Sequence, residues 1–223
     1  MAEAPDATVR SRFLEALDKL HERFLVGDAE ATEVWLVRHG DAYAELVSLD
    51  DSNIDPPLSA KGRAEAEKLG VRMAGSGITA IWASPIRRAQ ETAAIAAGAG
   101  GLEVRTDPRL REVRTHWDDG AEAPEAAEAG YIPFVEPLDE VIARMDGAIR
   151  DIVAAAGPGA RVAAVTHAGA ISMYLLHVLK LDSGPLRVLP LFTSVSVLLV
   201  KGERTVVQSI GDVGHLLRER PGG

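Results

Sequence analysis

From Glu33 onward, short apolar runs alternate with longer segments in which apolar residues recur every three or four positions. Val34–Val37 and Arg161–Thr166 are typical of buried strands, whereas Leu138–Ala156 is typical of an amphipathic helix. Strands that alternate with helices form a largely parallel sheet that is covered by helices on both sides. The sequence therefore predicts an α/β fold, a three-layer α/β/α sandwich with a mostly parallel central sheet.

The remaining elements follow from the same periodicity and from Gly and Pro at their ends. We expect helices over Ser59–Met73, Pro85–Ala97 and Ala168–Leu179, and strands over Ile78–Ala83 and Leu102–Arg105. Near the end of the chain, Ser194–Lys201 and Thr205–Ile210 alternate in polarity and are joined by Gly202-Glu203. This pattern predicts a hairpin at the edge of the sheet.

Residues 1–32 precede the first strand and form a separate amphipathic segment. Its apolar residues recur at helical spacing: Val9, Phe13, Leu14, Leu17, Leu20, Phe24 and Leu25. Its polar face mixes both signs of charge, which disfavours a membrane-surface role. We expect a helical extension that packs on the body of the protein or on a partner subunit, and a homodimer is consistent with it. The main domain is then 33–223, with a lid-like insertion at about 118–136.

Composition excludes several classes of protein. The chain has 223 residues, 47% of them hydrophobic and 26% charged, which suits a globular domain with one core. It has no cysteine, so disulfides and thiolate metal sites are excluded, and a cytoplasmic location is expected. There is no stretch long enough to span a bilayer and no secretory signal pattern at the N-terminus. The net charge of −9 argues against a nucleic-acid or anionic membrane surface.

Residues capable of chemistry follow each of the first four predicted strands. Arg38 and His39 follow the first, Arg88 comes shortly after the second, Glu112 follows the third and His167 the fourth. Ligands of such sheets bind at the carboxyl ends of the strands. The sequence therefore predicts two histidines, several arginines and a carboxylate at one edge of one sheet.

These residue types together indicate phosphoryl transfer. A neutral imidazole is nucleophilic near neutral pH and can take up a phosphoryl group. Guanidinium groups hold the oxygens of that group through charge-assisted hydrogen bonds. A carboxylic acid can protonate the leaving alkoxide. Gly40 and Gly169 are expected to let the backbone approach the phosphate closely.

Four ordered motifs carry a resemblance to a known family. They are Arg38-His39-Gly40, Ser84-Pro85-Ile86-Arg87-Arg88-Ala89, Leu110-Arg111-Glu112 and Thr166-His167-Ala168-Gly169. The chain resembles the histidine phosphatase superfamily, which has the phosphoglycerate-mutase-like fold, from about Glu33 to Leu217. Within this superfamily the chain resembles the phosphatase branch with the Arg-His-Gly motif.

The resemblance implies a role for each matched residue. His39 would be the nucleophile that becomes phosphorylated, Arg38 and Arg88 would hold the phosphoryl oxygens, and His167 would stabilise its charge. Glu112 would be the proton donor. The implied enzyme is a phosphoric monoester hydrolase that needs neither a cofactor nor a metal, and its partner is a small phosphorylated substrate.

Two departures from the family pattern leave alternatives open. Asp41-Ala42 follows Arg-His-Gly where many members have an acid or amide and then a hydroxyl residue. This opening is similar to that of bacterial protein phosphohistidine phosphatases, which is one alternative. A phosphate-binding regulatory module without catalysis is the other. The stretch 114–119 does not match the basic and aromatic stretch of the mutases, so a glycolytic mutase is not expected.

The sequence also predicts something about the substrate. We expect the substrate to be lined by Asp41, His116, Trp117 and Ala168. The insertion 118–136 has acidic residues and no Lys or Arg, which disfavours polyphosphates. Apolar residues could face a leaving group instead: Leu46, Tyr131, Ile132 and Phe134. The expected substrate is a monophosphate ester of a neutral or partly apolar alcohol.

Overall fold

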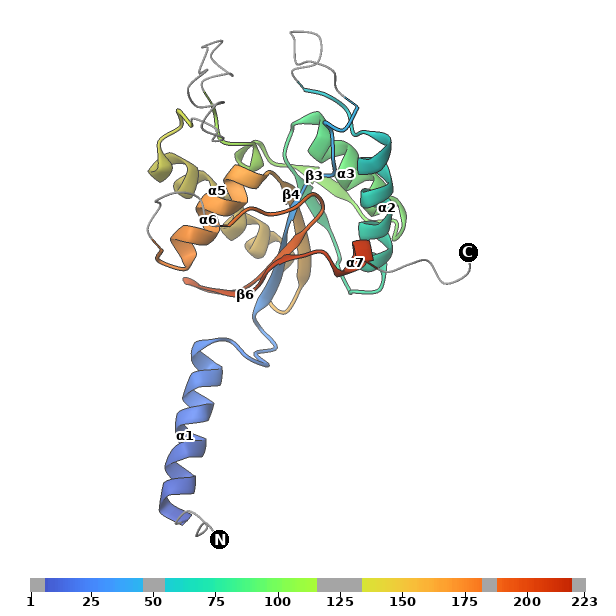
Figure 1. Cartoon of the computed structure of the whole chain (residues 1–223). Coiled ribbons are helices and arrows are strands. Elements are labelled where there is room, and N and C mark those ends of the chain that lie inside the picture. The colour runs from blue at the N-terminus through green and yellow to red at the C-terminus, as the bar shows by residue number, and fades with distance from the viewer. Residues whose placement is uncertain (1–6, 46–54, 116–133, 182–187, 218–223) are drawn as a thin grey trace.

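A six-stranded sheet runs through the centre of the molecule (Figure 1). The structure is a computed structural model and describes residues 7–45, 55–115, 134–181 and 188–217. The strands are β1 (Thr32–Arg38), β2 (Ile81–Ala83), β3 (Val104–Thr106), β4 (Arg161–Thr166), β5 (Val195–Lys201) and β6 (Arg204–Asp212). Their order across the sheet is β3-β2-β4-β1-β5-β6.

The sheet is parallel on one side of β1 and antiparallel on the other. The pairs β2–β3, β2–β4 and β1–β4 are parallel, and β5 runs antiparallel to both β1 and β6. The expected mostly parallel sheet with an edge hairpin is therefore confirmed. In the register of β1 and β4, Arg38 lies opposite Thr166, so both strands end at the same level.

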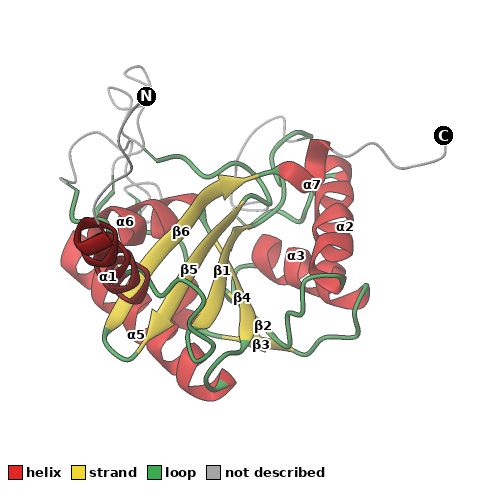
Figure 2. Ribbon diagram, turned by 90° about the horizontal axis from the view of Figure 1, so that it is seen from below, coloured by secondary structure: helices red, strands yellow, loops and turns green. Residues whose placement is uncertain are grey.

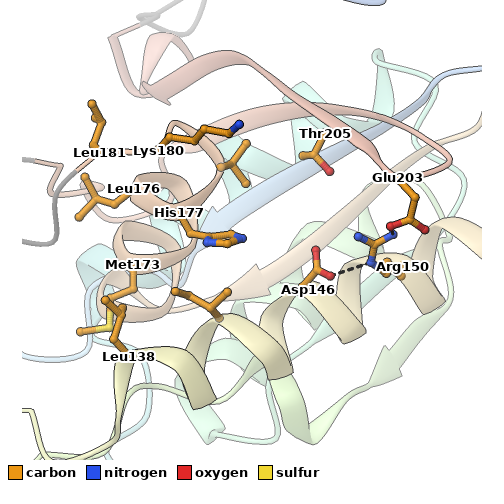
Figure 3. A pocket seen from close by; sticks show the side chains of 12 residues that line it. Leu138, Asp146, Arg150, Met173, Leu176, His177, Lys180, Leu181, Glu203 and Thr205 are labelled. Atoms are coloured by element: carbon orange, nitrogen blue, oxygen red, sulfur yellow. Dashed lines mark hydrogen bonds and ion pairs between the residues drawn. The ribbon is translucent and has the colours of Figure 1, made fainter.

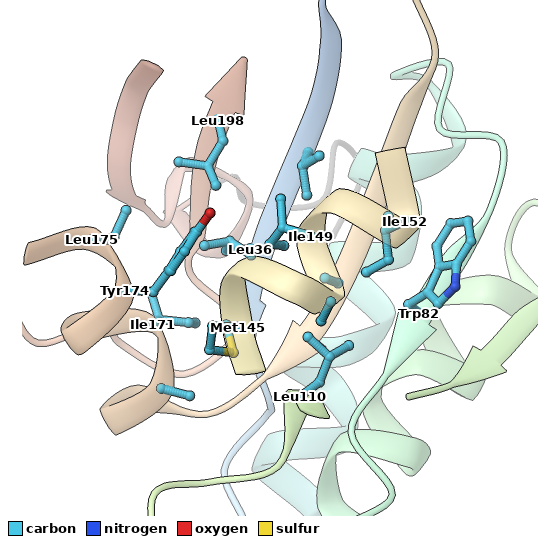
Figure 4. Close-up of a cluster of buried hydrophobic side chains, with 14 of the residues drawn as sticks. Leu36, Trp82, Leu110, Met145, Ile149, Ile152, Ile171, Tyr174, Leu175 and Leu198 are labelled. Carbon is cyan, nitrogen blue, oxygen red and sulfur yellow. The ribbon is translucent and has the colours of Figure 1, made fainter. Parts of the chain in front are cut away.

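Helices cover both faces of the sheet (Figure 2). The helices are α2 (Ala60–Ala74), α3 (Arg87–Gly98), α5 (Leu138–Ala156) and α6 (Ala168–Val178), with a short α7 (Gly214–Leu217) near the end. Residues of α5 and α6 share one buried hydrophobic cluster with the sheet (Figure 4). Residues of α2 and α3 share a second cluster with the other face. The three-layer sandwich is thus confirmed. None of the helices within the described ranges is long and apolar enough to cross a membrane.

The sequence placed α5 and β4 at their observed ends and misplaced some others. The second strand was expected from Ile78 but begins at Ile81. The backbone before it does not form the regular hydrogen bonds of a strand, although Thr79 N donates to Arg161 O. A 3-10 helix at Pro108–Leu110, capped by Asp107, was not expected. Three residues are too few to show a helical period.

The N-terminal helix α1 (Ala7–Arg23) projects away from the sandwich (Figure 1). Its side chains from Arg10 to Arg23 are exposed apart from the partly exposed Leu17. The expected packing of this helix on the body of the protein is therefore not seen.

Two glycines bring the turn after β1 against the start of α2. A Cβ atom at Gly40 would lie 2.7 Å from the backbone oxygen of Gly62, and a Cβ atom at Gly62 would collide with the backbone oxygen of Asp41. Ser59 caps α2, since its hydroxyl accepts a hydrogen bond from Gly62 N at 3.0 Å and donates one to Asp41 O at 3.0 Å. Helix α2 thereby fixes the backbone that follows His39.

We expect Gly62→Ala to lower the free energy of unfolding by about 1–3 kcal/mol, because the new methyl group forces backbone apart in a packed region. Urea denaturation followed by circular dichroism measures this.

The matched control is Gly75→Ala at the end of the same helix, where a Cβ atom would meet nothing within 4 Å. The control should change the free energy of unfolding by no more than about 1 kcal/mol. Equal effects of the two substitutions would contradict the close approach at Gly62.

Candidate active site

The paired ends of β1 and β4 bring two histidines together. His39 follows β1 directly, and His167 follows β4 and precedes α6. The backbone N–H of His39 donates to Thr166 O at 2.9 Å, and the two imidazole centroids are 5.1 Å apart. Arg88 reaches the same place from the first turn of α3. The structure thus brings together His39, Arg88 and His167, although His39 and His167 are 128 positions apart in the chain.

His39 is 2% exposed, and both of its ring nitrogens have partners. Nδ1 lies 2.7 Å from the carbonyl oxygen of Gly40, and Arg88 Nε donates to Nε2 at 3.1 Å. A carbonyl can only accept, so this network assigns the proton to Nδ1 and leaves a lone pair on Nε2. Burial, and then the charge of Arg88, hold the pKa of His39 well below 6.5. The imidazole is therefore neutral at neutral pH and carries its lone pair on Nε2.

His167 is fully buried and is oriented by a serine. Its Nε2 lies 2.8 Å from Ser84 Oγ, which also accepts a hydrogen bond from Ile86 N at 3.3 Å. The serine contact fixes the orientation of the ring. Within the described residues, the other ring nitrogen, Nδ1, is buried and has no hydrogen-bond partner. Burial, and then His39 and Arg88, lower the pKa of His167 and keep it neutral.

Two arginines flank the histidines. The Arg38 guanidinium donates from Nη1 to Pro190 O at 2.9 Å and stacks with its Cζ 3.9 Å from the centroid of Phe192. Its Nε has no partner in the part of the chain that the structure describes. Arg88 is 9% exposed and also lies 3.5 Å from Asp55.

Arg87 turns away from the site. Its side chain is 56% exposed and pairs with Glu91 at 2.9 Å. Arg88, one position on, is the arginine of this pair that contacts His39.

The aromatic rings of Tyr43 and Phe192 lie beside His39. Their ring centroids lie 6.3 and 5.8 Å from that of His39 and 6.2 Å from each other. Thr193 follows with φ of +52°, which is rare for a branched residue, and its backbone N–H donates to Arg38 O at 3.0 Å. Its hydroxyl contacts His215 Nε2 at 3.2 Å. The sequence did not predict the position of these two rings or the contact of Ser84 with His167, because neither forms a periodic pattern.

Glu112 lies against the start of α6. Its Oε1 accepts hydrogen bonds from Val113 N at 2.9 Å and Ala170 N at 3.0 Å, and Oε2 accepts one from Gly169 N at 3.3 Å. Burial raises the pKa of Glu112 and outweighs these hydrogen bonds, which lower it. The group therefore holds its proton to a higher pH than an exposed glutamate does. A general acid needs that property.

The glycines of the motifs approach protein groups. A Cβ atom at Gly169 would lie 2.8 Å from Glu112 Oε1, so this glycine makes room for the carboxyl group. Gly40 similarly makes room for α2. The structure therefore gives both glycines a packing reason that differs from the expected approach to a phosphate.

A buried ion cluster fixes the backbone around Glu112. Glu136 is 5% exposed and pairs with Arg111 and Arg144, each at 2.7 Å. Arg144 in turn donates to the backbone oxygens of Arg109 at 2.6 Å and Arg111 at 2.8 Å. Glu136 was assigned to the lid-like insertion. It is instead buried inside the protein, because the side chains of Arg111 and Arg144 and the backbone N–H of Arg114 donate to its carboxylate.

The remaining expected substrate contacts have mixed outcomes. Asp41 is buried and holds its own loop, because Oδ1 accepts from Tyr43 N at 2.8 Å and Oδ2 pairs with Lys61 at 3.3 Å. Ala168 is the partly buried first residue of α6, next to His167. Phe134 packs against the hydrophobic cluster of α5 and α6. The others lie outside the described residues: Leu46, His116, Trp117, Tyr131 and Ile132.

The donors around His39 suit an anion. The guanidinium groups of Arg38 and Arg88 lie beside the two histidines, and burial raises the pKa of Glu112. In the described ranges, no group of three or more His, Asp or Glu residues is placed to hold a metal ion. The arrangement favours binding of an oxyanion by N–H donors.

A separate hollow of about 640 Å³ lies between α5, α6 and the turn from β5 to β6 (Figure 3). Its charged groups neutralise one another, since Arg150 pairs with Asp146 at 2.6 Å and Glu203 at 2.9 Å. It lies toward the carboxyl end of α6, whereas His167 lies at the other end. The hollow is therefore not part of the histidine site.

A model of the histidine phosphatase superfamily (branch 1) matches residues 34–213. The chain belongs to this superfamily. The match contains all four motifs and ends just before α7, and it leaves out α1, which precedes residue 34.

Individual relatives agree with the family. A probable phosphoglycerate mutase GpmB of Cronobacter sakazakii is 33% identical over 205 residues, which cover 82% of this chain and 94% of the relative. Among solved structures, Bacillus stearothermophilus YhfR is 29% identical with a TM-score of 0.67, and the match covers 83% of this chain and all of that one. A mycobacterial glucosyl-3-phosphoglycerate phosphatase is 25% identical with a TM-score of 0.65, over 81% of this chain and 99% of that one.

We expect Glu136→Gln to lower the free energy of unfolding at pH 7 by about 3 kcal/mol, because it leaves arginine donors without their charged partner. The arginines hold the folded pKa of Glu136 at about 2, below the ordinary 4.5. The carboxylate therefore contributes stability above about pH 4.5, and this contribution is lost as the pH falls toward 2. Denaturation of both proteins at several pH values from 7 to 3 should show their difference shrinking.

Glu203→Gln is the matched control, because its partner is also an arginine but its side chain is 91% exposed. We expect a change below about 1 kcal/mol at every pH. A pH-independent effect of Glu136→Gln would contradict the role of its charge.

Proposed function

We propose that this protein is a cofactor-independent phosphatase that hydrolyses phosphomonoesters through a covalent phosphohistidine at His39. The observation that carries the proposal is the state of His39: a buried, neutral imidazole with Nδ1–H on Gly40 O and the lone pair of Nε2 facing Arg88. That nitrogen lies among guanidinium groups that can hold the transferring phosphoryl group.

In the first step, the lone pair of His39 Nε2 attacks phosphorus and the bond from phosphorus to the alcohol oxygen breaks. Glu112, whose pKa is raised by burial, gives its proton to the leaving oxygen. Arg38, Arg88 and His167 hold the equatorial oxygens, whose charge is spread in the transition state.

In the second step, a water molecule attacks the phosphorus of phosphohistidine. The Glu112 carboxylate, left by the first step, accepts the proton of that water. The bond from phosphorus to nitrogen breaks, the electron pair returns to Nε2, and phosphate leaves. The cycle ends with His39 neutral and Glu112 protonated, as at the start.

Mutase activity is the second candidate, because curated relatives are named probable phosphoglycerate mutases. A mutase must also hold the carboxylate of a phosphoglycerate. Two cations near the site already have partners: Lys61 pairs with Asp41 and Glu65, and Arg111 pairs with Glu136. This supports release of the phosphoryl group to water and favours the phosphatase.

The substrate is proposed to be a monophosphate ester with a neutral or partly apolar alcohol. Tyr43 and Phe192 offer ring surface next to His39, and Tyr43 is 39% exposed. Aromatic faces bind apolar and planar groups, whereas a second phosphate needs further cations.

The decisive experiment is hydrolysis of p-nitrophenyl phosphate in the presence of EDTA. We expect wild-type turnover and a loss of at least about 1,000-fold in kcat for His39→Ala, because the covalent route disappears. His177→Ala is the matched control, since it lies exposed on α6 by the other hollow and should keep full activity.

Retained activity of His39→Ala would overturn the mechanism. If the wild type is inactive on small esters, a phosphohistidine-containing protein is the next substrate, and binding without turnover would identify a phosphate-binding module. Incubation with 3-phosphoglycerate, followed by ³¹P NMR, separates a phosphatase from a mutase: the first yields inorganic phosphate and the second 2-phosphoglycerate.

The acid role of Glu112 predicts a dependence on the leaving group. We expect Glu112→Gln to lower kcat/KM by at least about 100-fold for an alkyl phosphate, whose alkoxide needs a proton. For p-nitrophenyl phosphate, whose phenolate leaves unaided, the loss should stay within about 10-fold. Equal losses on both substrates would remove Glu112 from this role.

A further inference from the structure

Helix α1 leaves a row of large apolar side chains in solvent. Phe13 is 64% exposed, Leu20 48% and Phe24 47%, and Leu17 is partly exposed. Phe24 belongs to the same surface, because its N–H donates to Leu20 O at 3.0 Å and extends the last turn. An isolated helix of this length is only marginally stable in water, so a partner that covers this row would also stabilise the helix.

The row has the spacing of a helix-pairing seam. Phe13, Leu17, Leu20 and Phe24 follow one another at intervals of four, three and four residues. At 3.6 residues per turn they fall within about 60° of one another, and the exposed Leu14 lies about 60° beyond Leu17. The charged residues Glu15, Asp18, Lys19 and Glu22 fall on the opposite side of the helix. Four apolar residues with this period fit a single partner helix.

The seam, which we define as Phe13, Leu17, Leu20 and Phe24, can pair with a second copy of itself. In either direction its order is Phe-Leu-Leu-Phe, with the same spacing. When two copies run antiparallel, Phe13 of one lies opposite Phe24 of the other, and Leu17 lies opposite Leu20. Such an arrangement has a twofold axis and uses the same surface on both chains.

The way in which α1 is anchored permits this pairing. Leu25 is buried at 3% exposure, and Arg204 of the edge hairpin donates to Glu22 O at 2.8 Å. Lys201 pairs with Asp28 at 2.9 Å and with Glu30 at 2.8 Å. The helix therefore projects from a fixed root, and its 17 residues span about 26 Å. Figure 1 shows α1 projecting from the body, so in an antiparallel pair the two bodies would lie at opposite ends of the paired helices.

We infer that α1 is a dimerisation element, which pairs antiparallel with α1 of a second copy of this chain through Phe13, Leu17, Leu20 and Phe24. The seam carries no cation, and the polar face of the helix mixes both signs of charge, which disfavours an anionic membrane as the occupant. The histidine site lies at the far edge of the sheet and belongs wholly to one chain in this arrangement.

The first test is the mass of the full chain in solution at about 100 μM, measured by light scattering after size exclusion. We expect twice the chain mass of 23.7 kDa. The double variant Leu17→Glu/Leu20→Glu should give 23.7 kDa, because four carboxylates would meet at the twofold axis. Glutamate keeps helix propensity high, so the helix itself is not the target.

The matched control carries two glutamates on the polar face, Ser11→Glu/Lys19→Glu, and should remain a dimer. Phosphate release from p-nitrophenyl phosphate checks that both variants are folded as the wild type is. A wild type that stays at the monomer mass overturns the inference, whether or not it binds to anionic phospholipid vesicles. A Leu17→Glu/Leu20→Glu variant that stays dimeric overturns it as well.

The second test fixes the orientation and uses the absence of cysteine from the chain. Phe13→Cys protein carrying an affinity tag is mixed with untagged Phe24→Cys protein and oxidised. An antiparallel pair yields the mixed disulfide, whereas a parallel pair yields Phe13→Cys linked to itself. Mainly self-linked products would overturn the antiparallel arrangement.

Discussion

The parallel pairing of β1 with β4 at the centre of the sheet is the constraint on which the site depends. Because Arg38 lies opposite Thr166, the two strands end level and release His39 and His167 at one point, with ring centroids 5.1 Å apart. The other side chains of the site, from α3, from the segment before β5 and from Glu112, lie around the point where these two strands end.

Burial then changes the pKa values of the titratable side chains at this point. It keeps the imidazoles uncharged and raises the pKa of the Glu112 carboxyl, because low-dielectric surroundings disfavour the charged form of each. Guanidinium groups keep their charge, since an arginine side chain is not deprotonated under these conditions. Neutral imidazoles, a carboxyl group with a raised pKa and fixed positive charge therefore lie close together.

The sequence predicted what depends on period and order, and missed what depends on irregular backbone. The exact ends of α5 and β4 and the meeting of His39 with His167 and Arg88 follow from apolar runs and from topology. Phe192, Thr193 and Pro190 reach Arg38 through a non-periodic segment with a positive φ, and no local pattern indicates such a contact. Asp41 was expected to line the substrate and Glu136 to belong to the lid-like insertion, but hydrogen-bond donors hold both carboxylates inside the protein.

The central position of β1 has a consequence for synthesis of the chain. Its two neighbours are β4 and β5, which are made 123 or more residues after its own end at Arg38. A ribosome-bound chain that has emerged only as far as β3 holds a first strand with neither neighbour, and the histidine that follows it has no carbonyl of Thr166 to anchor its backbone. His39 is among the first residues to be synthesised, whereas Thr166, whose carbonyl anchors its backbone, belongs to the last third of the chain. The arrangement of His39 beside His167 can therefore form only after most of the chain has been made.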